Sequence, residues 1–358
     1  MNSVSFIISI DNSFEMVNNF FNSFLDNQFV KNSEIILIND CIDSIKTINY
    51  LNKIEIENKN IRLINLKQKV GYGIANNIGV EQASNEYLFF INTDIFAMDD
   101  CFEKMLHSLE TNQADCVQPL LIWPQNKRIQ CAGSFFGPYY KNHLFAGRRP
   151  DSIDFSKIPN ERQALTSALY AMRKTVFFEH GKFDEFYYNK LESFELSLKL
   201  TLAGKKCICL PSAKAYHSQG AARNKYYFDF YQQEAYFWSH FGKQITPDVL
   251  NYYECQISKS MLNNTYTAIA ISQTRGIKQL INDTSLFINS YTEINGVNPL
   301  QINLFDLLPY SIHRQKTPLL FFVENITDLS KNMVWFDERN NQDIVMDTYG
   351  NLIYANLI

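Results

Sequence analysis

The feature that most constrains the fold is a run of five apolar residues, Tyr87–Ile91, that ends abruptly in Asn92-Thr93-Asp94. A short continuous apolar run is typical of a strand buried on both faces of a parallel sheet. A glycine-punctuated loop and a segment with apolar residues at helical spacing precede it. Residues 67–96 therefore predict a loop, a helix and a buried strand, with polar residues at the strand end where open α/β sheets bind ligands.

The same pattern is repeated towards the amino terminus, where three more apolar runs predict strands and two amphipathic segments predict helices. The strands are expected at Val4–Ile10, 34–38 and 61–66, and the helices at 14–25 and 44–51. Such alternation is typical of a parallel, doubly wound sheet with right-handed crossovers. The strand ends then bring Asp11, Asp40 and Asp94 to one edge of the sheet. Any one of these acids is better explained as a turn or cap residue, but three at strand ends indicate a site.

The composition limits the class of protein. With 358 residues, 46% of them hydrophobic, the chain can bury one large core or two ordinary ones. A net charge of −4 gives no electrostatic support for nucleic-acid binding. Seven cysteines without a CxxC motif, no signal-peptide pattern and no apolar run of roughly 18 residues favour a cytoplasmic protein. Peripheral attachment at the inner face of the plasma membrane is the alternative location.

Seven segments of about residues 1–225 have the order and spacing of one enzyme family. They are VSFIIS with DNS, EIILIND, VGYGIANNIGV, NEYLFFINTDI, RIQCAGSFF, ALTSALYAMRKTVFFEHGKFDE and ESFELSLKLTLAGKKCICLPSAKAYH. Together they resemble the inverting family 2 glycosyltransferases of the GT-A fold, especially the bacterial rhamnosyltransferase-like branch. The resemblance implies a Rossmann-like, mostly parallel sheet flanked by helices in a catalytic domain at 1–245. We expect an accessory α+β domain at 246–358.

The resemblance also implies an activity. A hexosyl- or deoxyhexosyltransferase of this kind moves a sugar, with inversion, from a UDP- or dTDP-linked donor to a hydroxyl of a growing cell-surface polysaccharide. The acceptor would be a glycan, free or lipid-linked, and a divalent cation, Mg²⁺ or Mn²⁺, would assist. By the same resemblance, Asp11 and Asp40 match positions that contact the nucleoside. Gly71 and Asn76 or Asn77 match the loop beside the donor.

Asn92-Thr93-Asp94 occupies the place of the metal-binding DxD motif in the family. The chemistry requires such a site independently, because a diphosphate leaves readily only once its charge is neutralised by a cation. Asp94 can be a hard oxygen ligand, whereas Asn92 offers only a neutral carbonyl. His217 matches a place where relatives often carry a histidine that faces the metal or diphosphate. A loop histidine without a ligand role is the alternative.

The chain departs from the family at the position of the acceptor-activating base. In the family a Glu-Asp pair opens a helix beneath the acceptor, and its second member is the usual base. This chain has Glu192-Ser193-Phe194-Glu195, and a serine hydroxyl is no base at neutral pH without its own activator. Glu192 and Glu195, three residues apart on one helix face, remain joint candidates. The alternative is that both only favour the positive end of the helix.

No motif of the family matches the chain beyond about residue 225. We expect strands at Tyr266–Ser272 and Leu319–Val323, a helix at 276–289, and a hairpin at 342–354 around Tyr349-Gly350-Asn351. The region can complete the acceptor site, form a homodimer interface or dock on membrane-bound acceptors.

Two other functions stay open. The first is a non-catalytic nucleotide-sugar-binding or scaffold subunit, which Asn92 and Ser193 suggest. The second is a transferase that acts on a protein or a small molecule.

Overall fold

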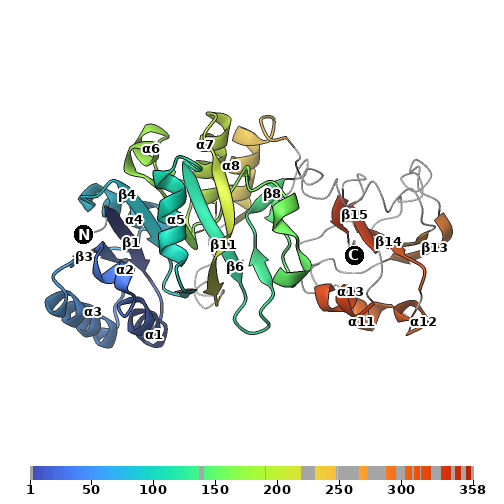
Figure 1. Ribbon diagram of the computed structural model, residues 1–358, viewed down its shortest axis with the longest axis horizontal. Helices are drawn as coiled ribbons and strands as arrows, with labels where there is room; N and C mark the ends of the chain where they lie inside the picture. Colours follow the sequence, from blue (N-terminus) through green and yellow to red (C-terminus); the bar gives the residue numbers. More distant parts are fainter. Residues whose placement is uncertain are drawn as a thin grey trace. The chain divides into compact units, whose positions relative to one another are not determined.

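The computed structural model divides into two compact units, which are described separately below (Figure 1). Unit 1 consists of residues 1–135, 143–145 and 160–245, and unit 2 of residues 136–142, 146–159 and 246–358. The predicted division at residue 245 remains a prediction. The residues whose structure is described are 3–136, 141–189, 191–218, 230–246, 248, 266–272, 288–295, 303–308, 310–314, 316–323, 332–339, 343–347 and 352–355.

Unit 1 is built on a nine-stranded sheet with the order β3-β2-β1-β4-β10-β6-β11-β5, and β7 pairs with β6. Its strands are β1 (Val4–Ile10), β2 (Glu34–Asn39), β3 (Ile61–Asn65), β4 (Tyr87–Ile91), β5 (Ile95–Ala97), β6 (Cys116–Ile122), β7 (Ile129–Cys131), β10 (Leu169–Arg173) and β11 (Cys207–His217). The first four strands in this order are parallel, and so are β6 and β11, whereas β5, β7 and β10 pair antiparallel. A separate pair is formed by β8 (Ser134–Phe136) and β9 (Lys141–His143).

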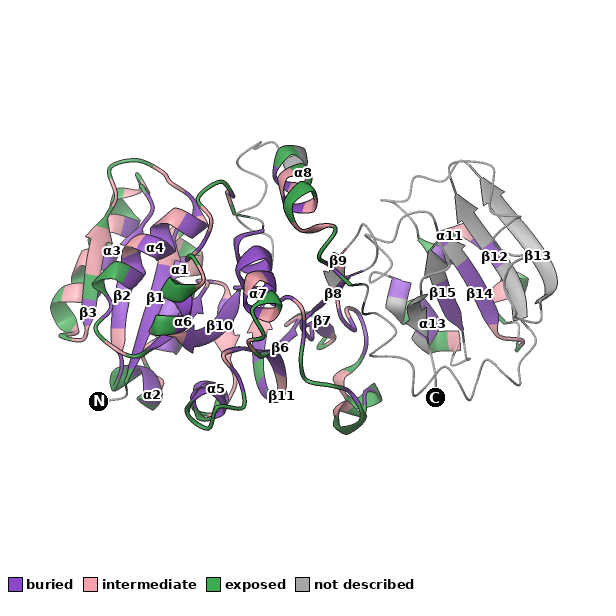
Figure 2. Cartoon of the chain, turned by 90° about the horizontal axis from the view of Figure 1, so that it is seen from above, coloured by how far each residue is buried: buried purple, intermediate pink, exposed green. Residues whose placement is uncertain are grey.

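The apolar runs make strands because both of their faces are covered. Alternate residues of β1 point to opposite faces, so that Phe6 joins one buried cluster and Ile7 the other. The first cluster packs against α1, α2, α3 and α5, and the second against α4, α6 and α7. These helices are α1 (Phe14–Phe24), α2 (Gln28–Lys31), α3 (Ile45–Glu57), α4 (Tyr72–Gln82), α5 (Cys101–Glu110), α6 (Lys174–Glu179) and α7 (Glu192–Leu202). Figure 2 shows buried strands between helices whose outer faces are exposed. The predicted α/β class is confirmed.

Unit 2 contains a second sheet, with the order β13-β12-β14-β15-β16. Its strands are β12 (Tyr266–Ser272), β13 (Ile288–Asn295), β14 (Leu319–Val323), β15 (Ile344–Asp347) and β16 (Leu352–Ala355), and its short helices are α11 (Leu304–Leu307), α12 (Tyr310–His313), α13 (Met333–Arg339), η1 (Pro150–Ser152) and η2 (Phe155–Lys157). All pairs are parallel except β15 with β16.

The structure tests several predictions in unit 2. The predicted strands β12 and β14 and the β15–β16 hairpin are confirmed. The helix predicted at 276–289 lies outside the described residues, except that its last two positions belong to β13. Strand β13 and helix α13 had not been predicted.

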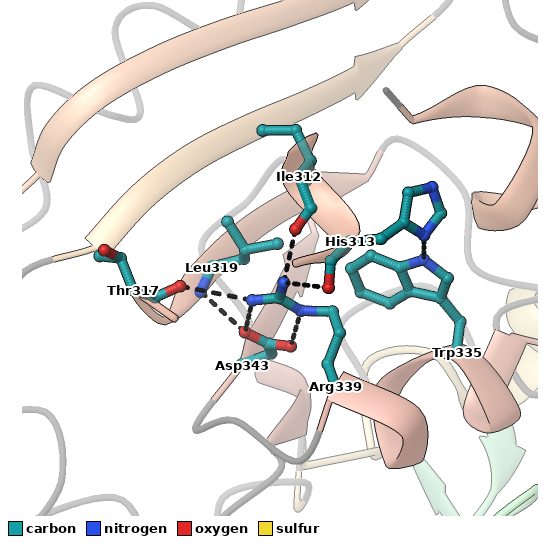
Figure 3. Close-up of polar contacts among 7 residues, drawn as sticks. All are labelled: Ile312, His313, Thr317, Leu319, Trp335, Arg339 and Asp343. Carbon is teal, nitrogen blue, oxygen red and sulfur yellow. Dashed lines mark hydrogen bonds and ion pairs between the residues drawn. The ribbon is translucent and has the colours of Figure 1, made fainter. Parts of the chain in front are cut away.

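A buried ion pair fixes α13 in unit 2 (Figure 3). Arg339 Nε lies 2.8 Å from Asp343 Oδ2, and Arg339 Nη2 lies 3.1 Å from Asp343 Oδ1. The same guanidinium donates to the carbonyl of Ile312 at 2.6 Å, while Asp343 Oδ1 accepts from the backbone N–H of Leu319 at 2.8 Å. Burial raises the pKa of Asp343, and Arg339 opposes that shift. The pair therefore joins α12, α13 and β14, with its charges compensated.

Gly79 allows α4 to lie directly on the sheet of unit 1. A Cβ atom at this position would lie 2.6 Å from Ile38 Cδ1 and 2.7 Å from Ile7 Cγ2. A Cβ atom does not come this close to another carbon without some displacement. The absence of a side chain at Gly79 therefore sets the distance between α4 and strands β1 and β2.

We expect Gly79→Ala to destabilise unit 1 by about 1–3 kcal/mol, because overpacking outweighs the gain in helix propensity. Native-state hydrogen exchange of the β1 and β2 amides measures this loss. The control Gln82→Ala, on the exposed side of the same helix, should stay within about 0.5 kcal/mol of the wild type. Equal protection in the two variants would contradict the close packing.

Candidate active site

The ends of β1, β2 and β4 bring three aspartates to one edge of the sheet, as predicted. The backbone N–H of Asp40 donates to the last carbonyl of β1 at 3.1 Å, which places Asp40 beside Asp11. Asn12 Nδ2 donates to Thr93 Oγ1 at 2.6 Å and ties the end of β1 to the segment that carries Asp94. The strand ends thus form one acidic site.

Asp11 shows that the three acids act on one another. Its Oδ2 lies 3.5 Å from Lys69 Nζ. Burial raises the pKa of Asp11, and the charges of Asp40 and Asp94 add to the rise, whereas Lys69 lowers it. Excess negative charge therefore accumulates at this edge, and the site favours a cationic partner.

Asp40 holds the loop that leads into α4. Its Oδ1 accepts from the backbone N–H of Val70 at 2.8 Å, and its Oδ2 accepts from that of Gly71 at 3.0 Å. Gly71 has a φ of 85°, and a Cβ atom there would lie 2.7 Å from the ring of Tyr188. The structure therefore gives Asp40 and Gly71 a shared role in shaping the loop. Their predicted contacts with a donor remain predictions.

Asn76 and Asn77 have different surroundings on α4. Asn77 exchanges two hydrogen bonds with the backbone of Phe183, at 2.9 and 3.2 Å, which is a packing role. Asn76 Nδ2 donates to the carbonyl of Tyr72 at 2.8 Å and to Ser9 Oγ at 3.3 Å. Its Oδ1 is buried and accepts no hydrogen bond from the described part of the chain. Of the two, Asn76 is the one with unused hydrogen-bonding capacity.

The three residues of the DxD position lie in different environments. Asn92 is half-buried and anchored by its N–H, which donates to the carbonyl of Ala168 at 2.9 Å. Thr93 is buried against Asn12. Asp94 follows on the short connection to β5, and its carbonyl accepts from the N–H of Ser218 at 3.0 Å. Only Asp94 offers a carboxylate.

His217 and Asp94 face each other across β11 and β5. His217 Nε2 lies 3.3 Å from Asp94 Oδ2, and His217 Nδ1 lies 2.5 Å from Gln130 Oε1 on β7. An amide oxygen only accepts hydrogen bonds, so Nδ1 donates to Gln130 and Nε2 is the ring nitrogen that faces Asp94. Gln130 therefore orients the histidine as an outer partner of a metal ligand does.

This donor set fits a divalent cation. The carboxylate of Asp94 suits Mn²⁺ or Mg²⁺, and its Oδ1 is buried without a hydrogen-bond partner among the described residues. Asp94 Oδ2 lies beside His217 Nε2. Their 3.3 Å separation is close to the ~3 Å between adjacent ligands of an octahedral ion with bonds of roughly 2.1 Å. The described residues contain no group of three or more His, Cys, Asp or Glu side chains that could hold a metal ion. Such cations usually complete their shell with water and phosphate oxygens.

The two candidate bases lie in the first turn of α7 but have different neighbours. Glu192 Cγ would lie 3.1 Å from a Cβ atom on Gly73, so this side chain packs against the start of α4. Glu195 is buried and forms an ion pair with Lys199. Burial raises the pKa of Tyr187, and the charge of Glu195 adds to that rise. The two glutamates therefore have different neighbours, and the choice of the base between them stays a prediction.

Three residues at this site were not predicted. Gln130 orients His217, Lys69 pairs with Asp11, and Tyr188 packs on Gly71. Lys69 could have been noticed, because it lies in the loop already singled out. The other two come from distant parts of the chain, and no local pattern marks them.

The mostly parallel sheet, with acids at its strand ends and the His217–Asp94 pair beside them, defines an α/β domain of the GT-A kind. Residues 5–167 match the model of glycosyl transferase family 2, which confirms the family resemblance over that part of the chain. A crystal structure of GalNAc-T7 with UDP, GalNAc and Mn²⁺ has a TM-score of 0.50 and 17% identity, covering 60% of this chain and 43% of that chain. That likeness confirms the GT-A fold.

Two curated relatives are similar in sequence. An uncharacterized protein of Sinorhizobium fredii is 24% identical over 226 residues, which is 62% of this chain and 25% of that protein. The O-antigen biosynthesis protein RfbC of Myxococcus xanthus is 28% identical over 158 residues, which is 42% of this chain and 12% of that protein. The chain thus spans a quarter or less of the length of these relatives. Among the residues that the structure describes, no helix is long and apolar enough to cross a membrane.

We expect Asp94→Asn to weaken Mn²⁺ binding by more than tenfold, because the carboxylate ligand is lost. Gln130→Leu should weaken it roughly tenfold to a hundredfold, because His217 loses the partner that orients it. Electron paramagnetic resonance of free Mn²⁺, with a nucleoside diphosphate present, measures both affinities. The control is His107→Ala, at an exposed position on α5. Wild-type affinity in Asp94→Asn would show that the metal lies elsewhere.

Proposed function

We propose that this chain is an inverting glycosyltransferase. It moves a hexosyl or deoxyhexosyl group from a UDP- or dTDP-linked sugar to a hydroxyl of a cell-surface glycan. The observation that carries the proposal is the oriented Asp94–His217 pair at the end of β4, inside a GT-A fold that matches family 2 over residues 5–167. The O-antigen biosynthesis protein of Myxococcus xanthus, at 28% identity, supports the choice of acceptor. The GalNAc-T7 structure with UDP and Mn²⁺ supports a nucleotide donor and a divalent cation.

Asp94 and His217 would hold the cation, Mg²⁺ or Mn²⁺. When bound, it neutralises the diphosphate, which makes that group a good leaving group. The chain itself contributes the loop held by Asp40, whose fixed backbone shapes the donor side of the site. Lys69 Nζ, 3.5 Å from Asp11, adds a positive charge at the same edge. Asp11 and Asp40 would contact the nucleoside, and Asn76 and Asn92 would contact the donor.

Glu192 is the better candidate for the base. Its side chain packs against Gly73, two residues from the Gly71 that is tied to Asp40, so it lies on the donor side of α7. Glu195 is less suited, because its carboxylate is already engaged in an ion pair with Lys199 on the same helix. In this proposal Glu192 takes the proton of the acceptor hydroxyl as its oxygen attacks the anomeric carbon. The diphosphate leaves from the opposite face, which inverts the configuration.

We expect Glu192→Gln to lower turnover by roughly two to four orders of magnitude and to leave donor affinity unchanged, as for loss of a general base. The matched variant Glu195→Gln should lose much less. Transfer from UDP- and dTDP-sugars to an oligosaccharide of the cognate glycan gives the rates, and calorimetric titration gives the affinities. Equal, small losses in both variants of an active enzyme would remove α7 as the source of the base.

Asn92 and Ser193 favour a second function, a non-catalytic subunit that binds nucleotide sugars. Both residues replace the acids expected at those positions, and Ser193 is buried with its carbonyl accepting from Ser197 Oγ at 2.5 Å. Such a subunit would bind donor but show no transfer, and Ser193→Asp would add activity. In an active enzyme the same change should do little or harm, because it crowds three acids into one turn. Transfer to a protein or small molecule would instead identify a different acceptor class.

The cellular setting is part of the same proposal. We place the reaction in the cytoplasm or at the inner face of the plasma membrane, on a free or lipid-linked glycan. A homodimer through the carboxyl-terminal region remains a prediction.

A further inference from the structure

Helix α8 (Phe230–Phe241) holds a loop of unit 1 that reaches the donor side of the site. Gln233 Oε1 accepts from the backbone N–H of Tyr188 at 2.8 Å. The hydroxyl of Tyr236 donates to Asp184 Oδ2 at 3.2 Å, and its ring stacks on that of Phe186 with the centroids 4.0 Å apart. Gln233 itself is only 5% exposed. The loop at 184–189 is therefore fastened to α8 by a buried amide and by a stacked ring pair.

The same loop contacts the start of α4 at two points. Asn189, in the left-handed region with a φ of 59°, accepts through Oδ1 from the backbone N–H of Tyr72 at 2.6 Å. The ring of Tyr188 lies against Gly71, only 2.7 Å from where a Cβ atom would be. Because Gly71 also donates to Asp40, contacts run without interruption from α8 to the end of β2.

The Tyr188 N–H is the central link in this series. This N–H belongs to Tyr188, whose ring lies against Gly71, so a shift of the Tyr188 backbone would move the ring. Without Gln233 the part-buried Tyr188 N–H would lose this acceptor, and the loss of that hydrogen bond would favour a shift of the backbone. Helix α8 lies outside residues 5–167, so its contribution is additional to the part that matches the family.

We propose that Gln233 is a positioning residue for the donor. It fixes Tyr188 against Gly71, and Tyr188 in turn forms the wall beside which the nucleoside diphosphate binds. The role rests on the proposed function, because it assumes that the loop held by Asp40 lies beside the donor. In this proposal α8 controls the affinity for the donor and affects neither acceptor binding nor the chemical step.

Gln233→Met tests this role, since it keeps the side-chain volume and removes the acceptor. The matched control is Gln232→Met, at the exposed neighbouring position on the same helix. Gln233→Glu, which keeps an acceptor oxygen, is the rescue variant. A further variant, Tyr188→Ala, removes the ring that lies against Gly71.

The readouts are the Kd for UDP and dTDP with Mn²⁺, the KM for donor and acceptor, and hydrogen exchange at the Gly71 and Tyr72 amides. Gln233→Met should raise the Kd and the donor KM about fivefold, the effect of one lost hydrogen bond. It should also speed exchange at both amides and leave the acceptor KM unchanged. Gln233→Glu and Gln232→Met should behave like the wild type, and Tyr188→Ala like Gln233→Met.

Unchanged exchange at Gly71 and Tyr72 in Gln233→Met would overturn the link between α8 and the loop. Faster exchange with unchanged Kd and donor KM would overturn the donor role and leave only a structural contact. A wild-type chain that binds neither nucleotide would overturn this inference together with the donor assignment. Binding that responds to Gln233→Met in a chain without transfer would support the inference and contradict only the proposed activity.

Discussion

The two hydrogen bonds from Val70 and Gly71 to Asp40 are the interaction on which the rest of the site depends. The Asp40 side chain is almost fully buried, and a buried carboxylate is costly unless its oxygens are satisfied. Here the loop supplies both donors, so the acid and the loop hold each other in place. This contact fixes where α4 begins, and with it the position of Gly73 against Glu192. One carboxylate at a strand end thus connects the sheet to the helix α7 that carries the proposed base.

The buried sheet explains why the chemistry is confined to strand ends. Within β1, β2 and β4, side chains on both faces are buried among apolar neighbours. A charge placed there would be desolvated without a partner, so acids are tolerated only at the ends of these strands. Parallel strands end at the same edge, and this brings Asp11, Asp40 and Asp94 together from residues far apart in sequence. The site therefore follows from the packing of the core.

The same physics decides what could be predicted from the sequence. Strands β1 and β4 could be predicted to the residue, because burial on two faces leaves an uninterrupted apolar run. The acids could be predicted because they end those runs. The partners of His217 could not, because Gln130 is 87 positions away and lies on a three-residue strand. The contact of Glu192 with Gly73 also depends on a tertiary neighbour, which helix spacing does not determine, whereas the Glu195–Lys199 pair is an i,i+4 contact within α7.

Asp343 and Asp94 differ in whether their carboxylate oxygens have hydrogen-bond partners, and this difference distinguishes a structural acid from a candidate functional one. Asp343 is fully buried, and both of its oxygens receive hydrogen bonds, from Arg339 and from the backbone of Leu319. Such a pair has no capacity left for a ligand, and its effect is to fix the helices around it. Asp94 has one oxygen facing His217 and another that is buried without a partner in the described part of the chain. Native proteins rarely leave a buried acceptor unsatisfied, and a bound ion or water is one way to satisfy it. The contrast supports Asp94 as the metal ligand independently of the family resemblance, because it depends only on the contacts of the two side chains.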